Sequence, residues 1–150
     1  MTIEARLLQD LPDAMRAGAA GERRKATIRL ARAAIKNAQI AAGQPLSDDE
    51  VVAVLQREVK QRRDSIEEYT KGHREDLAQI EREEIAILQQ YLPQQMSADE
   101  IRVVVQEIIT ATGAHGLADI SKVMPPLMAR LKGKAEGRLI NQVARQQLEG

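Results

Sequence analysis

Apolar residues recur at steps of three and four along every long segment of the chain, which is the spacing of one face of an α-helix. The segment 22–42 shows this most clearly, with Ile28, Ala31 and Ile35 on its apolar side. No stretch alternates apolar and polar residues in the manner of a half-buried strand. The pattern therefore predicts an all-α protein.

Capping residues indicate where several of these helices begin and end. Ser47 with Glu50, and Ser97 with Glu100, have the spacing of a capping box, in which each side chain accepts a hydrogen bond from the other residue's backbone N–H. Glycines are expected to close helices at Gly43, Gly72, Gly113 and Gly116. The expected helices after a first segment around 3–15 span about 22–42, 47–71, 74–90, 97–112, 118–131 and 135–148.

Prolines interrupt the helical pattern at three places. Pro12 lies inside the first helical segment and predicts a kink or a restart of that helix. Pro125 and Pro126 predict the same for the sixth helix, at about 118–131. Pro93 begins a short polar connection, which indicates a boundary near residue 95. We expect a domain of long helices at 1–93 and a small three-helix domain at 97–150.

Charge is balanced over the chain but is distributed unevenly along it. There are 22 basic and 22 acidic residues. Basic residues dominate 16–36 and 122–145, whereas acidic residues dominate 64–84. The basic run 60–63 is expected to form local ion pairs with Glu67 and Glu68.

Composition excludes several classes of protein. The chain has no Cys, which excludes disulfides, a thiol nucleophile and Cys-based metal sites. The longest apolar run, 51–55, is too short to cross a bilayer, and the first residues lack a basic region followed by an apolar one. We therefore expect no membrane association and a cytoplasmic location. The chain has two Tyr and no Phe or Trp, which argues against a protein that binds single-stranded nucleic acid by stacking bases on aromatic side chains.

Catalytic motifs are absent from the sequence. None of the serines lies in a Gly-x-Ser-x-Gly turn, and neither of the common glycine-rich phosphate loops occurs. His73 and His115 fall in predicted turns, without a second ligand at helical spacing. We expect no catalytic residue, no metal and no cofactor.

Four cations lie at one helical spacing within 22–42. Lys25, Arg29, Arg32 and Lys36 follow i, i+4, i+7 and i+11, which gathers them in a narrow stripe. Such a stripe can bind phosphates or an acidic partner. The alternatives are a solvated face or an intramolecular match to the acidic segment 64–84.

A second basic group surrounds the entry to the last predicted helix. Lys132, Lys134 and Arg138 lie among two glycines, and Asn141 follows one turn later. Glycine allows a phosphate backbone to approach closely, and a helix N-terminus presents free N–H groups to anions. The alternative is a glycine-containing turn between helices, with Asn141 as a polar core or capping residue.

Several short stretches of the sequence resemble motifs of known protein families. The stretches 59–67 (VKQRRDSIE), 72–77 (GHREDL) and 90–93 (QYLP) resemble the YqeY family of small bacterial proteins. The tail is similar to the C-terminal tail domain of GatB, a component of the tRNA-dependent amidotransferases, through 122–124 (KVM), Met128, Lys132, Gly133, Ala135, Gly137 and Asn141. The tail pattern often has Gly where this chain has Ser121 and Pro125, and Asp where it has Glu136.

The resemblance implies an all-helical, two-domain fold. In the amidotransferase, the tail domain helps to hold the tRNA whose misacylated amino acid is amidated, whereas the chemistry belongs to a cradle domain and to another protein of the complex. This chain contains neither. Members of the family that stand alone carry the label of a carbon–nitrogen ligase with glutamine as amido-nitrogen donor, which no motif in this sequence supports.

We therefore expect a non-catalytic helical adaptor that binds tRNA through the tail residues Lys132, Lys134, Arg138 and Asn141. The stripe on 22–42 would face the same RNA or a protein partner. One alternative is a protein-interaction module without an RNA role. The other is the glutamine-dependent carbon–nitrogen ligase of the family label.

Overall fold

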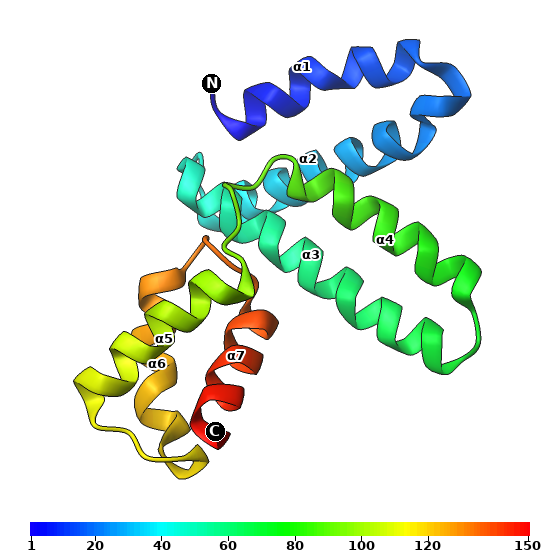
Figure 1. The fold of residues 1–150 in the computed structure, drawn as a ribbon. Helices are drawn as coiled ribbons and strands as arrows, with labels where there is room; N and C mark the ends of the chain where they lie inside the picture. The colour runs from blue at the N-terminus through cyan, green and yellow to red at the C-terminus, as the bar shows by residue number, and fades with distance from the viewer. The chain divides into compact units, whose positions relative to one another are not determined.

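The computed structural model describes residues 1–150, and it consists of helices joined by short connections (Figure 1). No residue lies in a strand, so the predicted all-α fold is confirmed. The chain divides into two compact units, which we call unit 1 (Met1–Pro93) and unit 2 (Gln94–Gly150). Each unit has a hydrophobic core of its own.

Unit 1 contains four α-helices and one short 3₁₀ helix, η1. These are α1 (Ile3–Arg16), η1 (Gly18–Gly21), α2 (Glu22–Ala42), α3 (Asp48–Lys71) and α4 (Glu75–Gln89). The helices α3 and α4 form a long antiparallel hairpin (Figure 1). Side chains from every α-helix meet in the core, which includes Leu7, Ile28, Leu55, Leu88 and, just beyond α4, Tyr91.

A close backbone approach sets the turn from α1 into α2. A Cβ atom on Gly21 would lie 2.0 Å from the carbonyl oxygen of Ala14. No side chain fits in that space, so glycine is required there. Gly21 thereby allows the end of α1 and the start of α2 to pack against each other.

The predicted caps are formed by local hydrogen bonds. The Glu50 N–H donates to Ser47 Oγ at 3.2 Å, and the Ser47 N–H donates to Glu50 Oε1 at 3.0 Å. The second capping box, at Ser97 and Glu100, has the same pair of bonds. Both capping-box predictions are confirmed.

The helix α3 ends in a different backbone conformation from the helices that end at Gly43 and Gly113. Gly72 has an ordinary φ of −83°, and the following residue, His73, carries the positive φ of 58°. Gly43 and Gly113, in contrast, end their helices in the left-handed conformation as expected. The predicted end of α3 at Gly72 is confirmed, and the positive φ follows at His73.

Prolines do not interrupt the helices that contain them. The helix α1 continues through Pro12, and no restart occurs. The carbonyl that Pro12 leaves without an intrahelical donor belongs to Leu8, which is exposed, so water can hydrogen-bond to it. Pro125 and Pro126 likewise lie on the exposed side of a continuous helix.

Unit 2 is a three-helix arrangement. It contains α5 (Ala98–Thr112), the 3₁₀ helix η2 (Leu117–Asp119), α6 (Ile120–Leu131) and α7 (Gly137–Glu149). The last helix begins at Gly137, two residues later than the sequence predicted, because the preceding residues form a turn. The core of unit 2 includes Ile101, Val105, Val123, Leu127, Ile140 and Ala144.

One buried tyrosine joins three helices of unit 1. Tyr91 is 2% exposed, and its hydroxyl donates a hydrogen bond to Asp10 Oδ2 on α1. Asp10 also lies 3.4 Å from Arg24 Nη2 on α2. The guanidinium of Arg6 lies over the ring, 5.0 Å from its centroid, and donates to the Gln90 carbonyl at 2.9 Å. Burial, together with the neighbouring Asp10 carboxylate, raises the pKa of Tyr91 to about 12.

Replacing this tyrosine tests the cluster. We expect Tyr91→Phe to lower the free energy of unfolding by about 1–2 kcal/mol, because Asp10 loses its hydroxyl donor. The wild-type protein should lose stability as the pH rises from about 10 toward about 12, since the folded state holds the Tyr91 proton more tightly than the unfolded state does. Urea unfolding across this pH range measures both effects. An identical alkaline loss in Tyr91→Phe would contradict this assignment.

Candidate functional site

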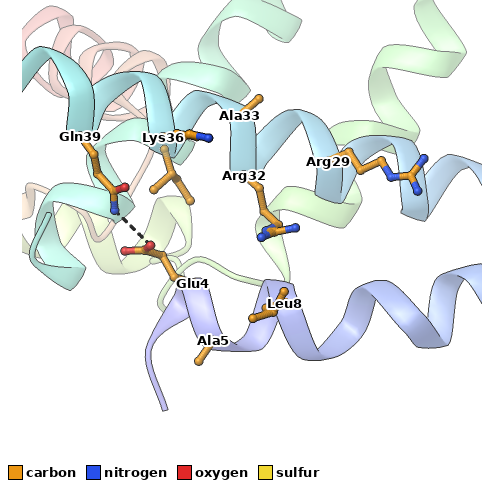
Figure 2. Close-up of a pocket in the computed structure, with 9 residues that line it drawn as sticks. Glu4, Ala5, Leu8, Arg29, Arg32, Ala33, Lys36 and Gln39 are labelled. Atoms are coloured by element: carbon orange, nitrogen blue, oxygen red, sulfur yellow. Dashed lines mark hydrogen bonds between the residues drawn. The ribbon is translucent and has the colours of Figure 1, made fainter. Parts of the chain in front are cut away.

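A groove runs between α1 and α2 in unit 1 (Figure 2). Its volume is about 540 Å³. Three of the four residues of the predicted cationic stripe, Arg29, Arg32 and Lys36, line it from α2. The fourth, Lys25, does not line the groove and is paired with Glu22 at 2.7 Å.

The opposite wall of the groove comes from α1. Ala5 and Leu8 contribute apolar surface, and Glu4 contributes the one carboxylate that lines the groove. Gln39 Nε2, on α2, donates to Glu4 Oε2 at 3.1 Å, as Figure 2 shows. The groove is therefore positively charged on one side and apolar on the other.

The sequence pattern predicted the basic wall but not the apolar one. Leu8 is 56% exposed, although it belongs to the apolar pattern of the first helix. Leu8 and Met15 are spaced i and i+7, on a different side of α1 from the buried Ile3 and Leu7. This second apolar row was a sequence feature from which the α1 wall could have been inferred.

The tail residues surround a tight turn in unit 2. Lys134 N–H donates to the Leu131 carbonyl at 2.9 Å, with Lys132 at φ −53°, ψ 125° and Gly133 at φ 79°. These angles define a type II turn, which requires a residue that tolerates positive φ at its third position. The turn expected as the alternative is therefore present, and it projects two exposed lysines.

This turn is also tied to the start of unit 2. The Met96 N–H donates to the Lys134 carbonyl at 2.8 Å, and Gln95 Nε2 donates to the Gly133 carbonyl at 3.4 Å. Two backbone carbonyls of the turn are thus used within the protein. The side chains of Lys132 and Lys134 remain exposed.

The other two predicted tail residues lie on α7. Arg138 is exposed in its first turn. Asn141 is half-buried and accepts a hydrogen bond from Arg145 Nε at 2.9 Å through Oδ1. The structure thus brings Lys132, Lys134 and Arg138 to the N-terminal end of α7, and Asn141 follows Arg138 on the same helix.

A compact charged cluster lies between α3 and α4. Arg62 is 8% exposed, and its Nε lies 2.7 Å from Glu84 and 4.0 Å from Glu81. Its Nη1 lies 3.3 Å from Glu58 and also donates to the Glu58 backbone carbonyl at 3.0 Å. For Arg62, the expected pairing with Glu67 and Glu68 is therefore wrong, because the α3–α4 hairpin supplies Glu81 and Glu84 instead.

The carboxylates of this cluster outnumber its single cation. Burial and the nearby Glu84 raise the pKa of Glu81, and the attraction of Arg62 offsets part of this rise. No group of three His, Cys, Asp or Glu side chains in the structure is arranged to hold a metal ion. The cluster consists of one buried cation shared among three acids.

The fold and its surfaces define a helical protein with two units, a basic groove in one and an exposed basic turn in the other. The family model for Yqey-like protein matches residues 4–148. The chain therefore belongs to the YqeY family, and its resemblance to that family is confirmed.

Relatives that match the chain carry the name "Altered inheritance of mitochondria protein 41, mitochondrial", and they include the following three. The Lachancea thermotolerans protein is 39% identical over 100 residues, which cover 66% of this chain and 52% of the relative. The Kluyveromyces lactis protein is 40% identical over 110 residues, which cover 71% of this chain and 58% of the relative. The Pyrenophora tritici-repentis protein is 30% identical over 136 residues, which cover 91% of this chain and 72% of the relative. The chain spans about half the length of the first of these relatives.

These names correct the expected location. The relatives are named as mitochondrial proteins, which contradicts the expectation of a cytoplasmic location. The expectation rested on the lack of a long apolar run and of a basic region followed by an apolar one, and neither feature separates proteins of the two compartments. None of the helices combines the length and the apolar character that crossing a bilayer requires.

A matched pair of substitutions tests the Arg62 cluster. At pH 7 we expect Glu84→Gln to destabilise unit 1 by about 1–3 kcal/mol, because Arg62 loses its closest ion pair. Glu81→Gln should be neutral or stabilising, because it removes a carboxylate whose pKa is raised. Any gain should disappear below about pH 4, where Glu81 is protonated in the wild type. Chemical unfolding at both pH values measures this, and equal losses in the two variants would contradict the assignment.

Proposed function

We propose that this protein is a non-catalytic adaptor that binds tRNA through the basic turn and the first turn of α7. The observation that carries the proposal is the exposure of Lys132 and Lys134 on a hydrogen-bonded type II turn next to Arg138. Lysines held on an ordered turn lose less conformational freedom on binding than lysines on a flexible chain. The similarity of the tail to the GatB tail of the tRNA-dependent amidotransferases supports RNA as the ligand.

The character of the surface favours phosphate contacts over base reading. The chain has only two aromatic residues, Tyr69 and Tyr91, and both belong to unit 1. Stacking of single-stranded bases on unit 2 therefore has no aromatic platform. Folded RNA, recognised by phosphates and shape, suits this surface better than a single strand.

Asn141 has a smaller part in this proposal than the three cations. Its Oδ1 accepts from Arg145, which leaves the amide NH₂ group as a donor. The stripe on α2 forms a second part of the proposal, in which Lys25, Arg29, Arg32 and Lys36 face the same RNA or a protein partner. The adaptor role needs both surfaces, whereas tRNA binding alone needs only the tail.

Binding to bulk tRNA, measured by filter binding at two salt concentrations, tests the tail. We expect submicromolar affinity at low salt that falls steeply as salt is added. The variant Lys132→Ala/Lys134→Ala/Arg138→Ala should lose at least tenfold in affinity. Its slope of log K against log salt should become shallower by about 2–3, since about one counterion is released per phosphate contact.

The matched control removes three cations from α3, as Arg57→Ala/Lys60→Ala/Lys71→Ala. It makes the same change in net charge at another surface of the protein, so it should bind tRNA within twofold of the wild type. Equal losses in the two triple variants would show that only overall charge matters and would refute the tail as the site. The absence of binding at low salt would refute the RNA role.

We also propose that the protein alone does not hydrolyse glutamine, because none of its serines lies in a nucleophile turn and it has no Cys. Pure protein incubated with glutamine should release no glutamate above a heat-treated control, as measured by coupled enzyme assay. Release that scales with protein concentration would support the carbon–nitrogen ligase label instead.

A further inference from the structure

We propose that the groove between α1 and α2 binds an amphipathic helix of a protein partner, with the apolar side of that helix on α1 and an acidic side on the cations of α2. The inference rests on the adaptor role proposed above, for which it names the protein-facing surface. Its test requires no RNA.

On the α1 side of the groove, Ala5 and Leu8 belong to an exposed apolar row that continues beyond the groove to Pro12 and Met15. Leu8 is 56% exposed and Met15 is 53% exposed. With Ala5 and Pro12, both also exposed, they follow steps of three, four and three along α1. This is the spacing of a coiled-coil seam, and it is distinct from the buried row that contains Leu7 and faces the core.

The α2 wall supplies cations that are available to a partner. Arg32 and Lys36 are exposed, and both line the groove. Glu4, the one carboxylate in the lining, is bonded to the neutral amide of Gln39 and keeps its charge, so the three cations of the lining outnumber it. Guanidinium groups form paired hydrogen bonds with carboxylates, so an acidic partner would find complementary charge here.

The combination of the two walls favours a helix over RNA as the occupant. A phosphate backbone would use the cations but would leave Leu8 and its apolar row without a partner. A helix with apolar residues at three- and four-residue steps and acids beside them satisfies both walls. Because Leu8 lines the groove together with Arg32, one ligand can contact both.

Two designed peptides of about three heptads provide the probe. Both carry Leu at positions a and d, and one has Glu at e and g where the other has Lys. We expect the Glu peptide, labelled with fluorescein, to bind the full-length protein in an anisotropy titration. The Lys peptide should bind at least tenfold more weakly, because it meets the like charges of α2.

Two variants with matched controls locate the site. Arg32→Glu/Lys36→Glu and Leu8→Ser should each weaken binding of the Glu peptide at least tenfold. The controls are Arg57→Glu/Lys60→Glu on α3 and Leu30→Ser on α2, where Leu30 is 50% exposed but does not line the groove. Both controls should stay within twofold of the wild type. All four changes replace exposed residues, so the variants should fold, and circular dichroism checks this.

Several outcomes would overturn the inference. One is equal affinity for the Glu and Lys peptides. A second is unchanged affinity for the Glu peptide in Leu8→Ser. Another is loss of tRNA affinity in Arg32→Glu/Lys36→Glu without any peptide binding, which would assign the groove to RNA. A homodimer in sedimentation equilibrium that Leu8→Ser dissociates would assign it to a second copy of the chain.

The test also separates the groove from the tail. The triple variant of Lys132, Lys134 and Arg138 should bind the Glu peptide like the wild type. Peptide binding without any tRNA binding would support the groove and refute the RNA role alone. tRNA binding that depends on the tail, without peptide binding, would refute the groove and leave the RNA role intact.

Discussion

The position of α1 depends on the buried hydroxyl of Tyr91. A hydroxyl removed from water is costly unless it finds a partner, and here the partner is Asp10 on α1. Asp10 is in turn held near Arg24 on α2. These polar contacts, the close approach at Gly21 and the buried apolar row of α1 together hold one side of α1 toward α2. The groove between α1 and α2 depends on this orientation of α1. The QYLP motif at 90–93, which contains Tyr91, therefore supports a groove whose two walls lie far from it in the sequence.

Features set by local interactions were predictable from the sequence. The capping boxes at Ser47 and Ser97 and the αL ends at Gly43 and Gly113 involve residues within a few positions of one another. Features that depend on surroundings were not. Continuity of α1 through Pro12 depends on solvent at the Leu8 carbonyl, and the partners of Arg62 depend on the α3–α4 hairpin.

The candidate site was predictable in part for the same reason. Helical geometry placed Arg29, Arg32 and Lys36 on one face before any tertiary contact was known. The α1 wall was predictable only in part, because the periodicity of α1 shows a second apolar row but does not indicate which of the two rows is covered. In the tail, the spacing of Lys132 and Lys134 around Gly133 is equally compatible with a turn and with a phosphate cradle. The structure shows that the turn is present and that its lysines are exposed, so the two interpretations coexist.

The distribution of tyrosines has a consequence for spectroscopy. Tyr69 and Tyr91 both belong to unit 1, and the chain has no Trp or Phe. Near-ultraviolet absorbance, circular dichroism and intrinsic fluorescence therefore report on unit 1 alone, whereas far-ultraviolet circular dichroism reports the helices of both units. A comparison of the two signals during denaturation resolves the unfolding of each unit in the unmodified protein. One tryptophan added to unit 2 would give it an optical label with no aromatic background from that unit.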